Sequence, residues 1–330
     1  MNGVVTMLRI VSRASARQCA VLPARGTHLA PAATTQRSRT MTMSGVMGMA
    51  VQALNAQSMA ISNIADNVAN AGTAGYKAVE TQFRDLVQGM QSAVSPVLGS
   101  TRQAGVIGYA DFNNRKQGQI ASDLDTPASA AIDGNGFFAV AKPASIDPAT
   151  GTATSFENET YYTRQGDFHL DSSGRLVNSA GFYLMASASP TGTSPSVLTI
   201  DTRDNAAGSG FTGVSIDDGG VITAHYADKT TTQQGQVVLA NFREPDELDR
   251  TDGTAYRVTA ESGDAVYGNP MAGTNRAGIG TIKGSALESS TVDTASQMTR
   301  LIVAQQAYSM NSQVIQMANE MMTTAVNLKG

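Results

Sequence analysis

Few residues in this 330-residue chain could carry out catalysis. Of the three histidines, His28 lies near the amino terminus, whereas His169 and His225 fall inside alternating, strand-like segments. A histidine on a strand is more often structural or solvent-facing than a general base. The single cysteine, Cys19, excludes a disulfide framework within the chain and a metal site built from several thiolates. We therefore do not expect nucleophilic or general-base catalysis.

Two pairs of aspartates could bind calcium or act as an acid pair: Asp123 with Asp125, and Asp217 with Asp218. Neither pair is accompanied by the remaining ligands and glycine of an EF-hand loop, so we interpret both as turn residues. The Gly-Asn-Gly segment at 134–136 is not a dinucleotide loop, because no helix follows it. A nucleophile elbow, an HExxH motif and a P-loop are also lacking from the sequence. We expect no enzyme activity, no cofactor, no metal and no small-molecule substrate.

Composition favours a β-rich protein over a coenzyme-binding α/β enzyme. Hydrophobic residues make up 41% of the chain and charged residues only 15%, with 32 glycines and no tryptophan. The net charge is −4, and residues 1–40 contain six arginines and no acid, so residues 41–330 carry −4 − 6 = −10. An acidic chain without clustered lysine or arginine is not expected to bind nucleic acid.

Residues 1–42 differ from the rest of the chain. They are arginine-rich, and their apolar stretches are too short for a secretory signal. We interpret them as a disordered leader, or as an extension ahead of a true start at Met41 or Met43. An organelle transit peptide is the alternative. No run in the chain approaches the ~20 apolar residues of a membrane-spanning helix.

The segment 46–70 shows helical periodicity, because mostly apolar residues recur there in steps of three and four. This seam consists of Met47, Ala50, Leu54, Gln57, Ile61, Ile64 and Val68. We expect the helix to end in the stretch 70–75, where a glycine would supply the positive φ of a C-cap.

The segment from about 289 to 328 shows the same periodicity on two faces. The first seam is formed by Val303, Ala307, Met310, Val314, Met317, Met321, Thr324 and Leu328. The second seam is formed by Met298, Leu301, Tyr308, Ile315, Met322 and Val326. Asp293, with Ser290 and Thr291, is expected to cap the start of this helix.

A helix with two apolar faces needs neighbours on both sides. Burying eight seam side chains would contribute about 1.5–3 kcal/mol each. Ordering about forty residues costs at least as much in total, at ~1–2 kcal/mol each. One interpretation is that both ends are mobile in the free subunit and fold when other copies supply the missing faces. The other is an intramolecular helical hairpin.

Between these helices, from about 105 to 281, two-fold alternation is punctuated by Gly, Asn and Asp turns. Expected strands include 137–140, 161–164, 175–177, 221–224 and 236–240. The expected fold class is mainly β with long terminal α-helices, that is, an antiparallel all-β body flanked by amino- and carboxyl-terminal coiled-coil-like helices. The expected divisions are 1–42, an assembly helix at 43–77, a β-rich body at 78–284 and a second assembly helix at 285–330.

Four stretches carry a family resemblance. They are residues 53–77, with ALNAQ, IADNVAN and GYK; residues 131–138, AIDGNGFF; residues 162–178, with YTRQG and LVN; and residues 284–308, with GSALESS and IVAQQAY. Taken in order, they resemble the bacterial flagellar hook and rod proteins. ALESS and the strand GQVVLANF at 235–242 favour the hook proteins. Hook proteins carry an outer domain where only about thirty residues here separate Leu184 from Val214, so hook and rod both stay open.

The resemblance implies a homopolymer that forms a helical tube lined by paired terminal helices. The implied assembly-interface residues are Leu54, Ile61, Ile64, Val68, Leu301, Val303, Tyr308, Met310, Val314, Met317 and Met321, and Gly75, Tyr76 and Lys77 would set the exit from the first helix. The implied partners are rod and hook-filament junction proteins, the hook cap and the flagellar export apparatus. The implied location is the flagellar basal body and hook, outside the cell, after export without a cleaved signal.

A secreted β-rich adhesin or polysaccharide-acting protein is the alternative from another class. Such an enzyme would need clustered carboxylates in a cleft. The candidates near one another in the sequence are Asp123, Asp125 and Asp133.

Overall fold

The computed structural model describes residues 43–86, 105–147, 152–189, 192, 194–205, 208–251, 254–270 and 278–328. The leader expected at 1–42 lies outside these ranges. The helices are α1 (Met43–Ala69), α2 (Thr294–Asn327) and the short 3-10 helix η1 (Pro245–Glu247). The strands are β1 (Val79–Leu86), β2 (Gly105–Phe112), β3 (Ile120–Ser122), β4 (Ala130–Asp133), β5 (Phe137–Ile146), β6 (Ala153–Thr163), β7 (His169–Leu170), β8 (Leu176–Val177), β9 (Tyr183–Ser187), β10 (Ser196–Val197), β11 (Phe211–Ile216), β12 (Val221–Tyr226), β13 (Thr231–Val237), β14 (Leu239–Asn241), β15 (Asp249–Arg250), β16 (Ala255–Arg257), β17 (Val266–Gly268), β18 (Thr281–Gly284) and β19 (Ala286–Glu288). This confirms the fold class of a β-rich body with one helix near each end.

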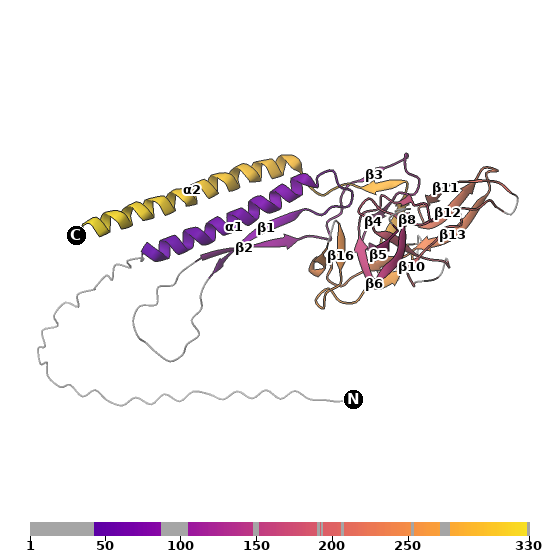
Figure 1. Ribbon diagram of the computed structural model, residues 1–330, viewed down its shortest axis with the longest axis horizontal. Coiled ribbons are helices and arrows are strands. Elements are labelled where there is room, and N and C mark those ends of the chain that lie inside the picture. Colours follow the sequence, from indigo (N-terminus) through magenta and orange to yellow (C-terminus); the bar gives the residue numbers. More distant parts are fainter. Residues whose placement is uncertain are drawn as a thin grey trace, which may run out of the picture. The chain divides into compact units, whose positions relative to one another are not determined.

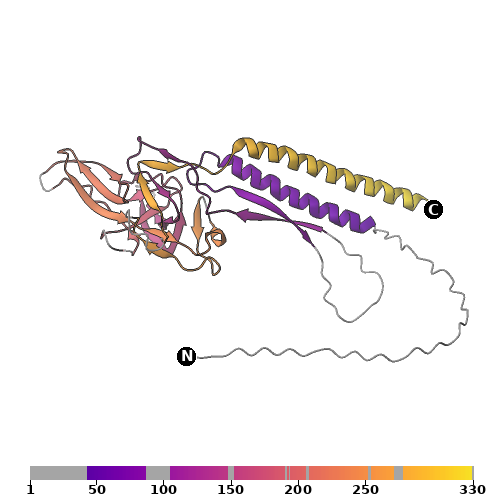
Figure 2. The same cartoon turned by 180° about the vertical axis from the view of Figure 1, so that it is seen from behind.

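The two long helices lie side by side, and the β1–β2 hairpin lies along α1 (Figures 1 and 2). The hairpin is antiparallel, with Val79 opposite Phe112 and Leu86 opposite Gly105. Strands β1 and β2 fall within the β-rich body expected at 78–284, but neither is among the individually expected strands. None of the described helices is long and apolar enough to cross a membrane.

The predicted helix ends are partly wrong. α1 ends at Ala69, but the positive φ in the following stretch belongs to Gly75, at +69°, and not to a glycine that directly follows the helix. The Asn70 side-chain amide instead donates to the Asp66 carbonyl over 2.9 Å. A Cβ at Gly75 would lie 2.6 Å from the Arg164 carbonyl carbon, so this glycine allows two backbone segments to pass closely.

α2 begins at Thr294 and not near 289, because the chain just before it is the strand β19. Asp293 is the N-cap, as expected, and its carboxylate accepts hydrogen bonds from the Ala295 and Ser296 amides. Thr291 was expected to help cap this helix. It does not, because its hydroxyl accepts a hydrogen bond from the Ala78 amide over 2.9 Å.

The main sheet of the body has thirteen strands, with a central order β11-β12-β13-β9-β5-β6-β16-β15. Every strand pair in the described ranges is antiparallel, as expected. Two small sheets, β18–β4 and β19–β3, bring the chain from the body to α2. The strands predicted at 137–140, 161–164, 175–177, 221–224 and 236–240 correspond to β5, β6, β8, β12 and β13–β14, with small shifts at their ends.

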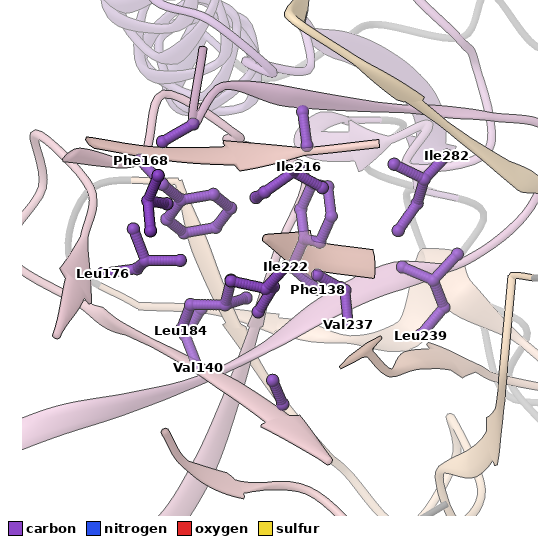
Figure 3. Close-up of a cluster of buried hydrophobic side chains, with 14 of the residues drawn as sticks. Phe138, Val140, Phe168, Leu176, Leu184, Ile216, Ile222, Val237, Leu239 and Ile282 are labelled. Carbon is purple, nitrogen blue, oxygen red and sulfur yellow. The ribbon is translucent and has the colours of Figure 1, made fainter. Parts of the chain in front are cut away.

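The first half of β5, residues 137–141, is buried on both faces, and its successive side chains point in opposite directions. Phe138 and Val140 join a large apolar cluster with Phe168 and Leu184, as Figure 3 shows. Phe137 points into a second cluster, where its ring packs edge-on at 5.6 Å from the Tyr256 ring. The adjacent phenylalanines of the sequence therefore serve two different cores.

Candidate assembly interface

The seam predicted on α1 is the packed face of that helix. Ala50 and Ile64 are buried, and Leu54, Ile61 and Val68 are half-buried. A second face of α1 packs on the β1–β2 hairpin, where a Cβ at Gly108 would lie 3.3 Å from Ala56. α1 is therefore covered by elements of the same chain over much of its surface.

α2 packs through residues that form neither predicted seam alone. Its buried residues are Gln297, Ala304 and Ala318. Leu301 and Ile315 of the second predicted seam are half-buried between them, so the packed face runs 297, 301, 304, 307, 311, 315, 318 in steps of three and four. Small side chains at this face let α1 and α2 approach closely.

The first predicted seam of α2 remains open to solvent. Its large apolar side chains are exposed as follows: Val303 60%, Met310 59%, Met317 53%, Met321 54% and Leu328 83%. Val314 is half-buried, and Tyr308, on the second seam, is 43% exposed. A contiguous apolar stripe on this scale is unusual on a monomer and is typical of an interaction surface.

The last described turns of α2 have no cover at all. Residues 319–328 are all exposed, and Ala318 is the last buried residue of the helix. α2 has 34 residues and α1 has 27. At ~1.5 Å per residue, α2 is therefore longer than α1 by about 10 Å.

A groove lies where α1, α2 and β1 meet. Its volume is about 280 Å³. It is lined by Gln57, Ala60, Asn63, Ile64, Val79, Thr81, Phe83, Gln297, Thr299, Arg300, Val303 and Ala304. Phe83 and Val303 are 49% and 60% exposed, so the groove presents apolar surface to solvent beside the open seam.

A buried charged cluster joins the two chain ends to the body. The Glu288 carboxylate, on β19, pairs with Lys77 through Oε1 and with Arg164 through Oε2, the latter over 3.3 Å. Its Oε1 also accepts a hydrogen bond from the Gly118 amide over 2.7 Å. All three charged side chains are at most 2% exposed. The cluster therefore connects the segment after α1, the segment before α2 and the main sheet.

The remaining polar atoms of this cluster are largely satisfied. Lys77 Nζ donates to the Lys116 carbonyl over 2.7 Å, and Arg164 Nη2 donates to the Gly134 carbonyl over 2.8 Å. Burial lowers the pKa of Lys77, and the neighbouring Glu288 carboxylate opposes that shift. Burial likewise lowers the pKa of Arg164.

A second polar junction lies at the end of α1. Asn67 is 1% exposed. Its side-chain amide nitrogen donates to the Val79 carbonyl over 2.7 Å, and its side-chain amide oxygen accepts from the Val79 amide over 2.9 Å. With Val79, Asn67 thus forms the pair of hydrogen bonds that a neighbouring strand would form. Its amide also reaches Gln297 of α2 over 3.3 Å, and it accepts from the Tyr76 hydroxyl over 3.3 Å. One asparagine thus ties α1 to β1 and to the first turns of α2.

Arg250 of the body supports the same exit. Its guanidinium donates to the Lys77 carbonyl over 2.8 Å and stacks 5.0 Å from the Tyr76 ring centroid. Gly75, Tyr76 and Lys77 are therefore all buried against the body. Their expected role in setting the exit from α1 fits these contacts, and their role in assembly stays a prediction.

The residues considered for catalysis take part in local structure. His225 Nε2 lies 2.7 Å from the Ser215 hydroxyl of the neighbouring strand, and His169 is exposed on β7. Asp123 accepts from the Asp125 amide within a turn, over 3.3 Å. In the described ranges, no three His, Cys, Asp or Glu residues are grouped so that they could hold a metal ion.

Comparisons with known proteins match three families in chain order. Residues 47–77 match the family described as "Flagella basal body rod protein", residues 131–224 match "Flagellar hook protein FlgE/F/G D1 domain", and residues 283–328 match "Flagellar basal body rod FlgEFG protein C-terminal". These ranges contain most of α1 and its exit, the strands from β5 to β11 with part of β12, and β19 with α2.

Whole proteins match as well. The flagellar basal-body rod protein FlgG of Agrobacterium fabrum is 30% identical over 294 residues, covering 86% of this chain and 99% of the relative. FlgG of Bacillus subtilis is 29% identical, covering 81% of this chain and 92% of the relative. The flagellar hook protein FlgE of Brucella abortus is 26% identical, covering 88% of this chain and all of the relative. With matches at both ends and the middle, in order, the chain belongs to the family of bacterial flagellar hook and basal-body rod proteins.

Proposed function

We propose that the protein is a structural subunit of the flagellar hook, which polymerises into a helical tube between rod and filament and transmits torque. The observation that carries this proposal is the open apolar seam of α2, formed by Val303, Met310, Met317, Met321 and Leu328. Each of these side chains is more than half exposed in the single chain. Covering them with another copy would contribute on the order of 1 kcal/mol per side chain.

The buried cluster around Glu288 supports the same proposal in mechanical terms. A subunit that transmits torque must pass force between its terminal helices and its body. Lys77 after α1 and Glu288 before α2 meet Arg164 of the body in one water-excluded cluster. Breaking such a cluster leaves an uncompensated buried charge, so the junction resists separation.

The partners and location follow from the family. We propose contacts with copies of the same chain, with rod and hook-filament junction proteins, with the hook cap during assembly, and with the flagellar export apparatus. The location would be the basal body and hook, outside the cell, after export without a cleaved signal. A secreted adhesin or polysaccharide-acting protein is no longer favoured, because the family is structural.

A rod subunit is the second candidate, and alignment lengths favour it. The match to Brucella abortus FlgE spans 419 positions but only 88% of these 330 residues, about 290, so about 129 positions face gaps in this chain. The match to Bacillus subtilis FlgG spans 278 positions and 81% of the chain, about 267, with few gaps. Immunogold labelling of purified hook-basal bodies distinguishes the two, because hook labelling supports the first proposal and labelling confined to the rod supports the second.

Replacing Met317 by aspartate tests the assembly surface. Met317 is 53% exposed, so the change should leave the fold of the single chain intact while placing a charge in the proposed contact. Ser309→Asp is the matched control, because Ser309 is also exposed on α2 but lies outside both predicted seams. We expect electron microscopy to show tubes for the wild-type chain and the control, and none for Met317→Asp. Normal tubes from a folded Met317→Asp protein would contradict the proposal.

A further inference from the structure

α2 carries one positive and one negative side chain, Arg300 and Glu320. Arg300 is about half exposed, and its Nη1 lies 3.2 Å from Glu80 Oε1 of β1. Glu320 is exposed, and no salt bridge joins it to any residue of the described ranges. Among the described residues, it is thus an acidic side chain without an ion-pair partner on an otherwise uncharged half of α2.

Both charges border the same apolar face, at opposite ends. Arg300 precedes Val303 by three residues, which places it at the start of the open seam. Glu320 directly precedes Met321 and flanks the seam near its other end. Charges that flank an apolar helix seam set the register and the choice of partner more than they add affinity.

The surfaces around the two charges both expose apolar side chains. Arg300 lies at a groove of about 280 Å³, whose wall includes the exposed apolar residues Phe83 and Val303. The segment around Glu320, residues 319–328, is a wholly exposed helix end. Its large apolar side chains Met321, Met322, Val326 and Leu328 are exposed by 54%, 41%, 68% and 83%.

We propose that residues 319–328 of one copy lie in the groove beside Arg300 of the next copy, and that Glu320 pairs with that arginine. This inference rests on the proposed polymerisation and specifies its geometry. The two charges are twenty residues apart, so parallel helices would be offset by about 30 Å, at ~1.5 Å per residue. Because groove and helix end are different surfaces, the contact is heterologous and can repeat along a tube without closing.

Charge reversal tests the pairing. The Glu80→Gln variant serves as the background, so that a glutamate at position 300 does not face Glu80. We expect R300E and E320R, each in this background, to raise the critical concentration for polymerisation about three- to tenfold, as attraction becomes repulsion at an exposed pair. The variant that combines R300E with E320R should have a critical concentration within about twofold of that of the E80Q background. The defects should shrink as salt is raised.

The outcomes separate this contact from the proposed function. If both reversals polymerise like the E80Q background, or if the combined reversal is no better than either alone, the pairing is refuted and the proposed function stands. If neither the wild-type chain nor the E80Q variant forms tubes under any condition, the proposed function itself fails, and this contact with it.

A crosslink tests the stagger independently. One chain carries Val303→Cys and a second chain carries Thr324→Cys, and both also carry Cys19→Ser. Positions 303 and 324 are 21 residues apart, one more than the proposed offset of twenty, so the two cysteines should lie close together in neighbouring copies. Tubes grown from the mixture and then oxidised should yield disulfide-linked pairs, whereas tubes of either chain alone should not. Absence of crosslinks in well-formed mixed tubes would show that residues 319–328 of one copy do not lie beside Val303 of the next, and would overturn the proposal.

Discussion

Glu288→Gln is the substitution that most directly tests the buried junction between the terminal helices and the body. The carboxylate faces two cations, Lys77 and Arg164, and also accepts from the Gly118 amide. Its replacement leaves both cations buried without a counter-charge. Removing one partner of a buried pair typically costs about 3–5 kcal/mol. That is a large fraction of the ~5–15 kcal/mol that stabilises a typical domain.

Urea unfolding followed by circular dichroism measures this loss. With a slope of about 2–3 kcal/mol per molar urea, the midpoint should fall by roughly 1–2 M. Glu261→Gln is the control, because Glu261 is exposed, and its midpoint should not move by more than about 0.2 M, since surface changes are typically within ~0.5 kcal/mol. The double variant K77M/E288Q should be more stable than E288Q, because it removes one of the two stranded cations.

The pH dependence provides a second readout. Burial already lowers the pKa of Lys77, and loss of Glu288 should lower it further, because the carboxylate opposes that shift. A lysine with a lowered folded pKa binds fewer protons folded than unfolded, so stability rises as pH rises through its folded pKa. The deficit of E288Q should therefore shrink as the pH rises toward 10.5, the ordinary pKa of a lysine. An E288Q protein as stable as the Glu261→Gln control at pH 7 would refute the role assigned to this cluster.

Two further predictions concern the exit from α1 and the aromatic core. Gly75→Ala should lower the unfolding free energy by about 1–3 kcal/mol, because φ is +69° and the added Cβ would lie 2.6 Å from the Arg164 carbonyl carbon. The urea midpoint of Gly75→Ala measures this loss. Gly48→Ala is the control, because a Cβ added at Gly48 would have no atom within 4 Å. Alkaline pH should also destabilise the body: hydrogen bonds to Glu157 and burial raise the pKa of Tyr161 to about 12, and burial raises the pKa values of Tyr76, Tyr162 and Tyr256. Because the pKa values of these tyrosines are higher in the folded state, their contribution to stability is complete below about pH 10 and is lost toward pH 12. Lys77 has the opposite effect on stability, but it is one group against four tyrosines. Thermal melts from pH 9 to 11.5 should show a falling midpoint, and a flat or rising one would contradict this.

The apolar patterns of the sequence predicted most of the architecture. Steps of three and four identified both helices, and Asp293 was correctly identified as the cap of α2. The double phenylalanine at 137–138 marked the strand at the centre of the body. These predictions succeeded because apolar periodicity reports directly on which faces of an element are buried.

Other features could not be obtained from apolar periodicity. The face of α2 that packs on α1 uses Gln297, Ala304 and Ala318, which are polar or small and add little to an apolar pattern. The β1–β2 hairpin was missed because its solvent-facing side carries Glu80, Gln82 and Arg84, so that the alternation is only half apolar.

The polar residues of the buried junctions were also missed as candidates. Asn67, Arg164 and Glu288 all lie in the stretches that carry the family resemblance, but they were not singled out there as site residues. Their burial depends on partners far away in the sequence, such as Gln297 for Asn67 and Lys77 for Glu288. The available signal was the position of these polar residues within the resembling stretches, beside the helix exit and just before the last helix.

Hydrogen exchange on α2, compared between the dilute single chain and the assembled tube, tests the proposed assembly surface most directly. The open seam and the uncovered turns at 319–328 predict rapid exchange in the single chain and strong protection in the tube, greatest in those last turns. The strands of the central sheet should be protected equally in both states. If α2 is already fully protected in the single chain, or gains no protection in the tube, then copies of the protein do not assemble through this helix.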